Sequence, residues 1–211
     1  MYTVYRRDSS GSAVVEAVLG LIGEPYKGET MIRGPDGRFQ DSLYRINPLG
    51  NVPVLVLPDG TVMTESAAMV LYLADTHRAA NLAPPIDSPL RPLYLRWMLF
   101  LAVNVYMSIL RIVYSDRYTS DPASAAAVRS AAQSRVAAEW DIYAAALGKG
   151  PFILGEDMSA ADIYAAMLVA WNDDVPTFFQ RHPQMRAMYE RVTRVPAVAK
   201  VWTDSKMEQW I

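Results

Sequence analysis

The stretch that most constrains this chain runs from residue 47 to 74, where the pattern changes from strand to helix. A turn containing proline and glycine precedes an apolar run at 54–57, which suits a strand buried on both faces. A Pro-Asp-Gly turn then leads into a partner strand at 61–64. From residue 65 onward, apolar side chains recur at helical spacing. The stretch therefore predicts a β-hairpin that leads directly into a helix.

Val52 and Pro53 stand immediately before the predicted buried strand, where proline normally costs a ladder hydrogen bond. A cis Val52–Pro53 peptide bond would turn the Val52 backbone outward and leave its N–H and C=O free to pair with an extended ligand. An ordinary trans proline at the start of a strand is the alternative.

Glu65 and Ser66 stand at the start of the predicted helix. A plain N-cap is one interpretation. The other is a binding site, in which the helix N-terminus and the hydroxyl bind a carboxylate while Glu65 binds an ammonium group beside it. The second interpretation predicts recognition of a zwitterion that resembles an amino acid.

These features together resemble the glutathione-binding half of the cytosolic glutathione S-transferases. The resemblance is carried by Asn-Pro-Leu-Gly-Asn-Val-Pro at 47–53, Asp-Gly at 59–60, Thr-Glu-Ser-Ala-Ala at 64–68 and Leu-Tyr-Leu at 71–73. In that family the Val-Pro bond is cis and the Glu-Ser pair holds the γ-glutamyl end of glutathione. The resemblance therefore implies a cis Val52–Pro53 bond and a glutathione-binding role for Glu65 and Ser66.

The rest of the chain is organised as the resemblance implies. Residues 1–76 read strand, helix, strand, helix, strand, strand, helix, which is the order of a thioredoxin-like α+β domain. Residues 77–92 are rich in proline and form a linker, and residues 93–211 are helical in pattern. One long helix is expected from Leu93 to about Tyr118. We therefore expect a thioredoxin-like domain, a linker and an all-helical domain, the glutathione transferase fold.

Ser159 and Asp162 have the spacing of a helix capping box, with Asp where Glu or Gln is usual. A similar Ser/Thr-x-x-Asp cap follows a glycine-containing loop in the transferase family, matched here by residues 152–155. We interpret this motif as a helix nucleation signal with no catalytic role.

Composition excludes several classes of function. The net charge of −2 gives no electrostatic case for nucleic acid or an anionic membrane. The sequence has no cysteine, which excludes disulfides, thiolate metal ligands and a cysteine nucleophile, and its two histidines are far apart, so we expect no metal site. The apolar stretch 97–114 is interrupted by polar residues and predicts a buried or half-buried helix rather than a membrane span. We expect a cytoplasmic protein.

Glutathione chemistry needs a stabilised thiolate, because a free thiol is mostly protonated at neutral pH. Ser9, Ser10 and Ser12 stand where a hydroxyl donor should be, between the first strand and the first helix. The Ser-x-x-Ser pattern resembles serine-type transferases of the theta and zeta classes and favours Ser9, with Gly11 where zeta-like enzymes have cysteine. A beta-class alignment favours Ser10. The alternative is that all three serines only cap the helix, and Ser12 is the one expected to do so.

The resemblance also implies further binding residues. Asn51 stands where the family often has Lys or Gln for the glycine end of glutathione, and Arg38 or Gln40 can assist it. Tyr106 and Arg111 on the long helix are candidates for the acceptor-substrate pocket, expected between the domains. The alternative for Arg38 and Gln40 is that they are solvated surface residues. The alternative for Tyr106 and Arg111 is core packing or an interhelical ion pair.

The sequence therefore predicts a dimeric glutathione S-transferase that conjugates glutathione, as co-substrate, to a small hydrophobic electrophile. Two alternatives stay open: a non-catalytic binding or interaction protein with the same fold, and a zeta-like glutathione-dependent isomerase. A disulfide reductase that uses its own cysteine is excluded, because the chain has none.

Overall fold

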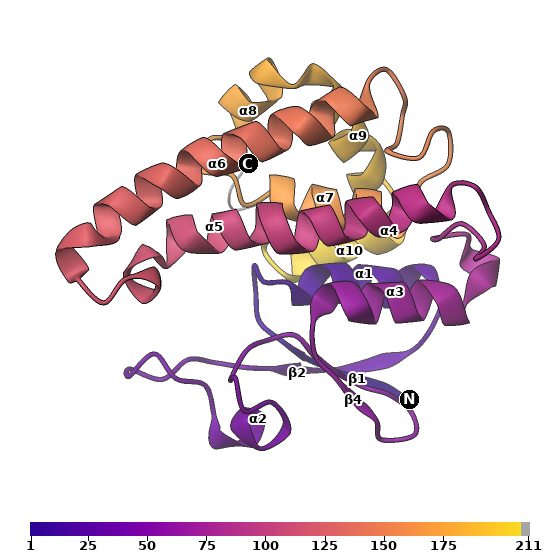
Figure 1. The fold of residues 1–211 in the computed structure, drawn as a ribbon. Helices are drawn as coiled ribbons and strands as arrows, with labels where there is room; N and C mark the ends of the chain where they lie inside the picture. Colours follow the sequence, from indigo (N-terminus) through magenta and orange to yellow (C-terminus); the bar gives the residue numbers. More distant parts are fainter. Residues whose placement is uncertain (208–211) are drawn as a thin grey trace. The chain divides into compact units, whose positions relative to one another are not determined.

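The computed structural model describes residues 1–207, and these form two compact units (Figure 1). The first unit comprises residues 1–86 together with the segment from 192 to the end of the described chain. The second comprises residues 87–191. The two units divide between residues 86 and 87, inside the segment 77–92 expected to be a linker, and the last described segment belongs to the N-terminal unit.

The first unit is built on a four-stranded sheet of order β2-β1-β3-β4. Strand β1 (Tyr2–Arg6) pairs in parallel with β2 (Tyr26–Thr30) and antiparallel with β3 (Val54–Val56). Strand β4 (Val62–Met63) closes the predicted hairpin against β3. The parallel pair needs a crossover, which the first helix supplies.

Helices cover both faces of this sheet (Figure 1). Helices α1 (Ser12–Leu21) and α3 (Ser66–Thr76) pack against each other on one face, and α2 (Asp41–Ile46) lies on the other. Helix α10 (Pro196–Asp204) packs on α1, and a short 3₁₀ turn (Arg78–Ala80) follows α3. Because α1 is covered from several sides, its first eight residues are all buried, including Glu16. The thioredoxin-like prediction for this unit is confirmed.

The second unit is helical, as predicted. Its helices are α4 (Arg91–Phe100), α5 (Tyr106–Val113), α6 (Ala125–Leu147), α7 (Ala160–Val169), α8 (Val175–Arg181) and α9 (Pro183–Thr193). Short 3₁₀ turns at Ser115–Tyr118 and Pro122–Ser124 lie between α5 and α6. The single long helix expected from Leu93 is divided by a π-helical turn at Leu101–Val105 and ends at Val113.

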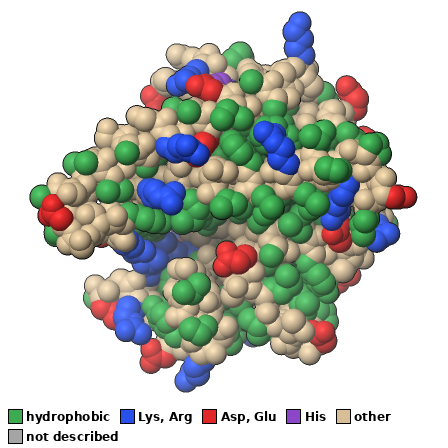
Figure 2. Space-filling model, in the orientation of Figure 1, with side chains coloured by type: hydrophobic (Ala, Val, Ile, Leu, Met, Phe, Trp, Pro, Cys, Tyr) green, Lys and Arg blue, Asp and Glu red, His purple; other side chains and the backbone are tan. Residues whose placement is uncertain are grey.

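The segment Arg91–Val113 is the one part of the described chain long and apolar enough to cross a membrane by length and composition alone. A core helix of a soluble protein has the same character, and 39% of the apolar window is buried inside the protein. Its outward face stays apolar, with Leu99 and Val103 exposed by 53% and 61%. Figure 2 shows hydrophobic side chains gathered along the band where Figure 1 draws α4 and α5.

Helix α7 begins with the predicted capping box. The Asp162 carboxylate is fully buried and accepts hydrogen bonds from the Ser159 N–H at 2.8 Å, the Ser159 hydroxyl at 2.7 Å and the Ile153 N–H at 2.8 Å. Burial raises the pKa of Asp162 to about 6, and the three donors oppose that rise. The carboxylate thus joins the helix start to the preceding loop.

Candidate functional site

Sheet topology brings three functional segments to one end of the first unit. The register pairs Tyr5 near the end of β1 with Val54 at the start of β3, and Leu55 with Met63 at the end of β4. Because these neighbours are antiparallel, the loop after β1, the residues before β3 and the residues after β4 all leave the sheet at the same end. These segments carry the serines, the Val-Pro pair and the Glu-Ser pair.

The Val52–Pro53 peptide bond is cis, which confirms the prediction. Among the described residues, the Val52 N–H and C=O have no hydrogen-bond partner, so both are available to an extended ligand. Buried Asn47, which the sequence analysis did not single out, braces the preceding turn: its Nδ2 donates to the Asn51 carbonyl at 2.9 Å and its Oδ1 accepts from the Leu49 N–H at 3.2 Å. An Asn-Pro turn is the sequence signal that points to such a brace.

Gly50 completes this turn and has a positive φ of 62°. A Cβ atom at this position would collide with the aromatic ring of Tyr44. Glycine is therefore required both by the backbone conformation and by the close approach of the ring.

Ser66 is the first residue of α3 and is half-buried, and Glu65 precedes it as an exposed residue. Glu65 has φ of 65° and ψ of 100°, a conformation that non-glycine residues rarely adopt, and its side chain does not cap the helix. The Glu65 side chain is therefore not a plain N-cap of α3.

The serines of the β1–α1 loop have different partners. The Ser9 N–H donates to the Ser205 carbonyl at 2.8 Å, and the Ser9 hydroxyl donates to the Lys206 carbonyl at 3.0 Å. The Ser10 hydroxyl donates to the Arg7 carbonyl at 2.7 Å and accepts from the Ser12 N–H at 3.3 Å. The Ser10 hydroxyl oxygen thus accepts a hydrogen bond from the first N–H of α1.

Ser12 does not cap the helix as expected. Its hydroxyl donates to the Arg7 carbonyl at 3.3 Å and lies 3.1 Å from the Ser10 hydroxyl. The N-cap position is Gly11, which has no side chain to offer. The expectation failed because the chain bends back at Ser9, which places the Ser10 oxygen closer to the first helical N–H than the sequence spacing suggests.

A buried ionic cluster lies beneath this loop and was missed by the sequence analysis. Glu16, on α1, receives the Arg6 guanidinium at 2.8 Å and the Tyr26 hydroxyl at 3.2 Å. Burial raises the pKa of Glu16, and Arg6 opposes the rise. Burial and the neighbouring Glu16 likewise raise the pKa of Tyr26 well above its usual range. Glu16 is the one acidic residue in an otherwise apolar helical pattern, and this is the only local sequence signal of the cluster.

Arg38 and Gln40 are exposed and have local partners. The Arg38 guanidinium lies 4.8 Å from the centre of the Tyr44 ring, a cation–π contact. The Gln40 Oε1 accepts from the Ile32 N–H at 3.2 Å and precedes α2. Asn51 is exposed, and its carbonyl is held by Asn47.

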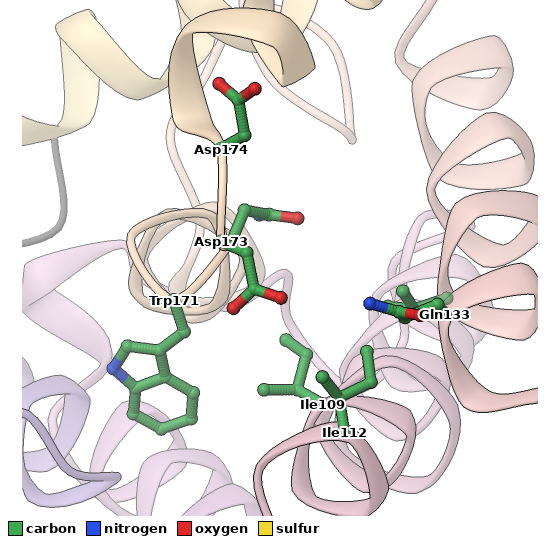
Figure 3. A pocket seen from close by; sticks show the side chains of 8 residues that line it. Ile109, Ile112, Gln133, Trp171, Asp173 and Asp174 are labelled. Atoms are coloured by element: carbon green, nitrogen blue, oxygen red, sulfur yellow. The ribbon is translucent and has the colours of Figure 1, made fainter. Parts of the chain in front are cut away.

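The second unit holds the two predicted acceptor-site residues. Tyr106 meets the Trp171 ring edge-on, with centroids 5.1 Å apart, and Arg111 lies 5.3 Å above the Tyr118 ring. A cavity of about 220 Å³ lies in the same unit and is lined by Trp171, but neither Tyr106 nor Arg111 lines it. Its walls come from α5, α6 and the α7–α8 connection (Figure 3): Ile109, Ile112, Gln133, Val136, Trp171, Asn172, Asp173 and Asp174.

Within residues 1–207, no group of three or more histidine, aspartate or glutamate side chains is arranged to hold a metal ion.

Comparison with known proteins covers both units. Residues 9–76 match the family described as glutathione S-transferase, N-terminal domain, and residues 104–205 match glutathione S-transferase, C-terminal domain. An uncharacterized GST-like protein, YncG, of Escherichia coli strain K12 is 28% identical over 206 residues, which cover 95% of this chain and 97% of that protein. The maleylacetoacetate isomerase of Rhizobium meliloti strain 1021 is 39% identical over 90 residues, 41% of this chain and 40% of that protein.

Among solved structures, a glutathione transferase homologue from Sulfitobacter with bound glutathione is 26% identical, with a TM-score of 0.85. The match covers 98% of this chain and 99% of that chain. This solved structure therefore has the same fold as this chain, with a thioredoxin-like unit and a helical unit.

Proposed function

The chain belongs to the glutathione S-transferase family, and from this premise we propose that it conjugates glutathione to a small hydrophobic electrophile. One observation carries the proposal. The unpaired backbone of Val52, the serine at the start of α3 and the serines before α1 all lie at the same end of the sheet. An extended tripeptide with charged ends fits such an arrangement.

Each end of glutathione has a partner in this proposal. The N-terminus of α3 with Ser66 binds the γ-glutamyl carboxylate, and Glu65 binds the adjacent ammonium. The Val52 backbone pairs with the cysteinyl residue as a short β-bridge. Asn51, with help from Arg38 or Gln40, binds the glycine carboxylate. The glutathione bound to the Sulfitobacter homologue supports the ligand class.

The thiolate would lie before the N-terminus of α1, where the helix dipole favours negative charge. We propose Ser10 as the hydroxyl donor, ahead of Ser9. The Ser10 hydroxyl lies at the start of α1, where it accepts from the Ser12 N–H, whereas the N–H and the hydroxyl of Ser9 are both bonded to the segment at 205–206. Ser10 would turn its proton from the Arg7 carbonyl to the sulfur. The thiol proton passes to solvent, and the sulfur lone pair forms the new carbon–sulfur bond. In a displacement, the leaving group departs with its bonding electrons.

The electrophile is held by the helical unit in this proposal, near Tyr106 and Trp171. The cavity beside Trp171 has aliphatic walls from α5 and α6 and a polar rim from Asp173 and Asp174 (Figure 3). Arg111, on the same helix as Ile109 and Ile112, is the second proposed contact. Replacing Trp171 by Ala should raise the KM for an aromatic electrophile while leaving glutathione affinity unchanged.

A zeta-like isomerase is the second candidate. It is favoured by the serine pattern at residues 9–12 and by the 39% identity to a maleylacetoacetate isomerase over 90 residues. Glycine at position 11, where the zeta class has cysteine, argues against it. In an isomerisation, glutathione would add to the substrate and leave again unchanged.

Three measurements on the purified protein test these functions. Calorimetry with glutathione should show binding, and thiolate absorbance against pH should show a lowered thiol pKa for bound glutathione. Turnover of an aryl halide with glutathione indicates a transferase. Turnover of maleylacetoacetate with glutathione, but not of the aryl halide, indicates the isomerase. Binding without either turnover indicates a non-catalytic binding protein, and no binding refutes all three.

We also propose that the protein forms a homodimer in which a second copy covers the apolar face of α4 and α5. Replacing Leu99 and Val103 by Lys should then give a monomer in analytical ultracentrifugation. Ile32→Lys, at an exposed apolar residue in the first unit, serves as the control and should leave the mass unchanged.

A further inference from the structure

The last described residues of the chain bind the loop that carries the candidate thiol-stabilising serines. The Ser205 and Lys206 carbonyls accept the backbone N–H and the hydroxyl of Ser9, at 2.8 and 3.0 Å. These contacts join segments 196 and 197 residues apart in the sequence, both within the first compact unit.

Charged side chains add two further contacts between the same segments. The Lys206 ammonium lies 2.7 Å from the Asp8 carboxylate, and the Arg6 guanidinium donates to the Asp204 carbonyl at 3.4 Å. The Lys206 and Asp8 side chains are 57% and 37% exposed, so their ion pair alone contributes little. Arg6 also binds the buried Glu16 on α1, and therefore connects the C-terminal segment to the helix itself.

Both segments adopt conformations that serve the contact. Ser9 has φ of 49° and Lys206 has φ of 52°, in the left-handed region that costs free energy for residues with a Cβ atom. Buried Ser205 and Met207 flank Lys206 and hold it in place, and α10 packs closely on α1 where Gly20 faces Ala197. A left-handed Ser9 determines where the next residue, Ser10, presents its hydroxyl.

We propose that segment 204–206 is a positioning element of the thiol site. Its two carbonyls hold Ser9 in the left-handed conformation, and this keeps the Ser10 hydroxyl and the N-terminus of α1 directed toward the sulfur. Lys206 acts through its backbone geometry rather than through its charge. This inference rests on the proposed glutathione chemistry, which it extends by naming what maintains the geometry of the site.

The test is a series of substitutions at Lys206 in the full chain. Lys206→Gly removes the ion pair and keeps the left-handed conformation, which glycine adopts freely. Lys206→Val keeps the N–H but disfavours positive φ because it is β-branched. Lys206→Pro forbids positive φ and also removes the N–H that donates to the Thr203 carbonyl at 3.1 Å.

We expect the thiol pKa of bound glutathione to rise by about one unit in the proline variant, which lowers the acid dissociation constant about tenfold and the thiolate fraction at neutral pH by up to that factor. kcat should fall by a similar factor, with a smaller change in the valine variant and parent-like behaviour in the glycine variant. Glutathione affinity should change less than about twofold, because the ends of the tripeptide are bound elsewhere.

Thermal unfolding and circular dichroism establish that each variant is folded, and if the proline variant is not, the valine variant decides. A parent-like thiol pKa in a folded proline or valine variant overturns the proposal. So does a glycine variant as impaired as the proline variant, because the charge would then be the cause.

Hydrogen exchange without ligand tests the same positioning independently of glutathione. The Ser9 amide, which donates to the Ser205 carbonyl, should exchange faster in the valine and proline variants than in the parent and the glycine variant. If the parent leaves the pKa of glutathione at its ordinary value, the proposed function fails. Faster Ser9 exchange would then still support the positioning of the loop, and unchanged exchange would overturn it.

Discussion

Two helix starts in this chain carry serine, and they are built in opposite ways. At α7, the buried Asp162 carboxylate accepts hydrogen bonds from the Ser159 N–H, the Ser159 hydroxyl and the Ile153 N–H. At α1, the N-cap is Gly11 without a side-chain cap, and Ser10 donates to a carbonyl of the preceding loop. A helix start that exists for stability satisfies its polar groups internally. In the proposed function, the Ser10 hydroxyl at the start of α1 instead exchanges the Arg7 carbonyl for the thiol sulfur.

The largest effect expected from this difference is on stability at α7. Asp162→Ala leaves the buried Ile153 and Ser159 N–H groups without an acceptor and should lower the free energy of unfolding by about 3–4 kcal/mol. Ser10→Ala should lower it by less than about 1 kcal/mol. Urea denaturation of both variants measures the contrast, and equal losses would remove the distinction between the two helix starts.

The pH dependence of the free energy of unfolding should reveal the titration of the buried Asp162 carboxyl. The pKa of Asp162 is about 6 in the folded protein and 3.8 ordinarily, so between these values the folded chain holds a proton that the unfolded chain has released. The contribution of this group is therefore complete below pH 3.8 and is lost as pH rises through 6. Its size is on the order of 2–3 kcal/mol.

Asp162→Asn is the matched control, because it cannot titrate. The free energy of unfolding of the parent, minus that of the variant, should decline between about pH 4 and pH 6. Identical pH profiles would mean that the three donors keep the carboxylate ionised in the folded protein.

The effect at α1 should appear in catalysis. Ser10→Ala should raise the thiol pKa of bound glutathione and lower turnover by about one to two powers of ten, the scale of losing a hydrogen bond to a charged group. Thiolate absorbance against pH, with Ser9→Ala in parallel, measures it. A raised pKa in Ser9→Ala alone would transfer the role to Ser9, and two parent-like curves would end the serine mechanism.

The smallest effect is expected at α3. Ser66→Ala should weaken glutathione binding about fivefold, the size of one ordinary hydrogen bond, and should change folding stability less. Glu65→Ala should act in the same direction by removing the partner of the ammonium group. Unchanged affinity in calorimetry for both variants would show that α3 is a structural helix start like α7.

Local sequence was sufficient for the features that depend on neighbouring residues. The hairpin, the start of α3 at Ser66 and the capping box at Ser159 were all predictable, because turn chemistry and capping act over a few residues. The Val-Pro prediction needed the family resemblance, since spacing alone left both isomers open.

The features that the sequence did not reveal depend on distant residues. The partners of Ser9 are almost the whole chain away, and Glu16 meets Arg6 and Tyr26 only because the sheet brings them together. The π-helical turn at Leu101–Val105 contains Asn104 and lies within a mostly apolar stretch that predicts one continuous helix. Tertiary packing overrides helix periodicity at such positions.

The return of the chain to its first unit also has a consequence for biosynthesis. A ribosome that has released residues 1–86 has completed every strand of the sheet, yet the segment that covers α1 and holds Ser9 follows more than a hundred residues later. Domains tend to fold in the order in which they are synthesised, but here the first unit must wait for the helical unit to be made. Until then, the apolar face of α1 that receives α10 lacks this cover.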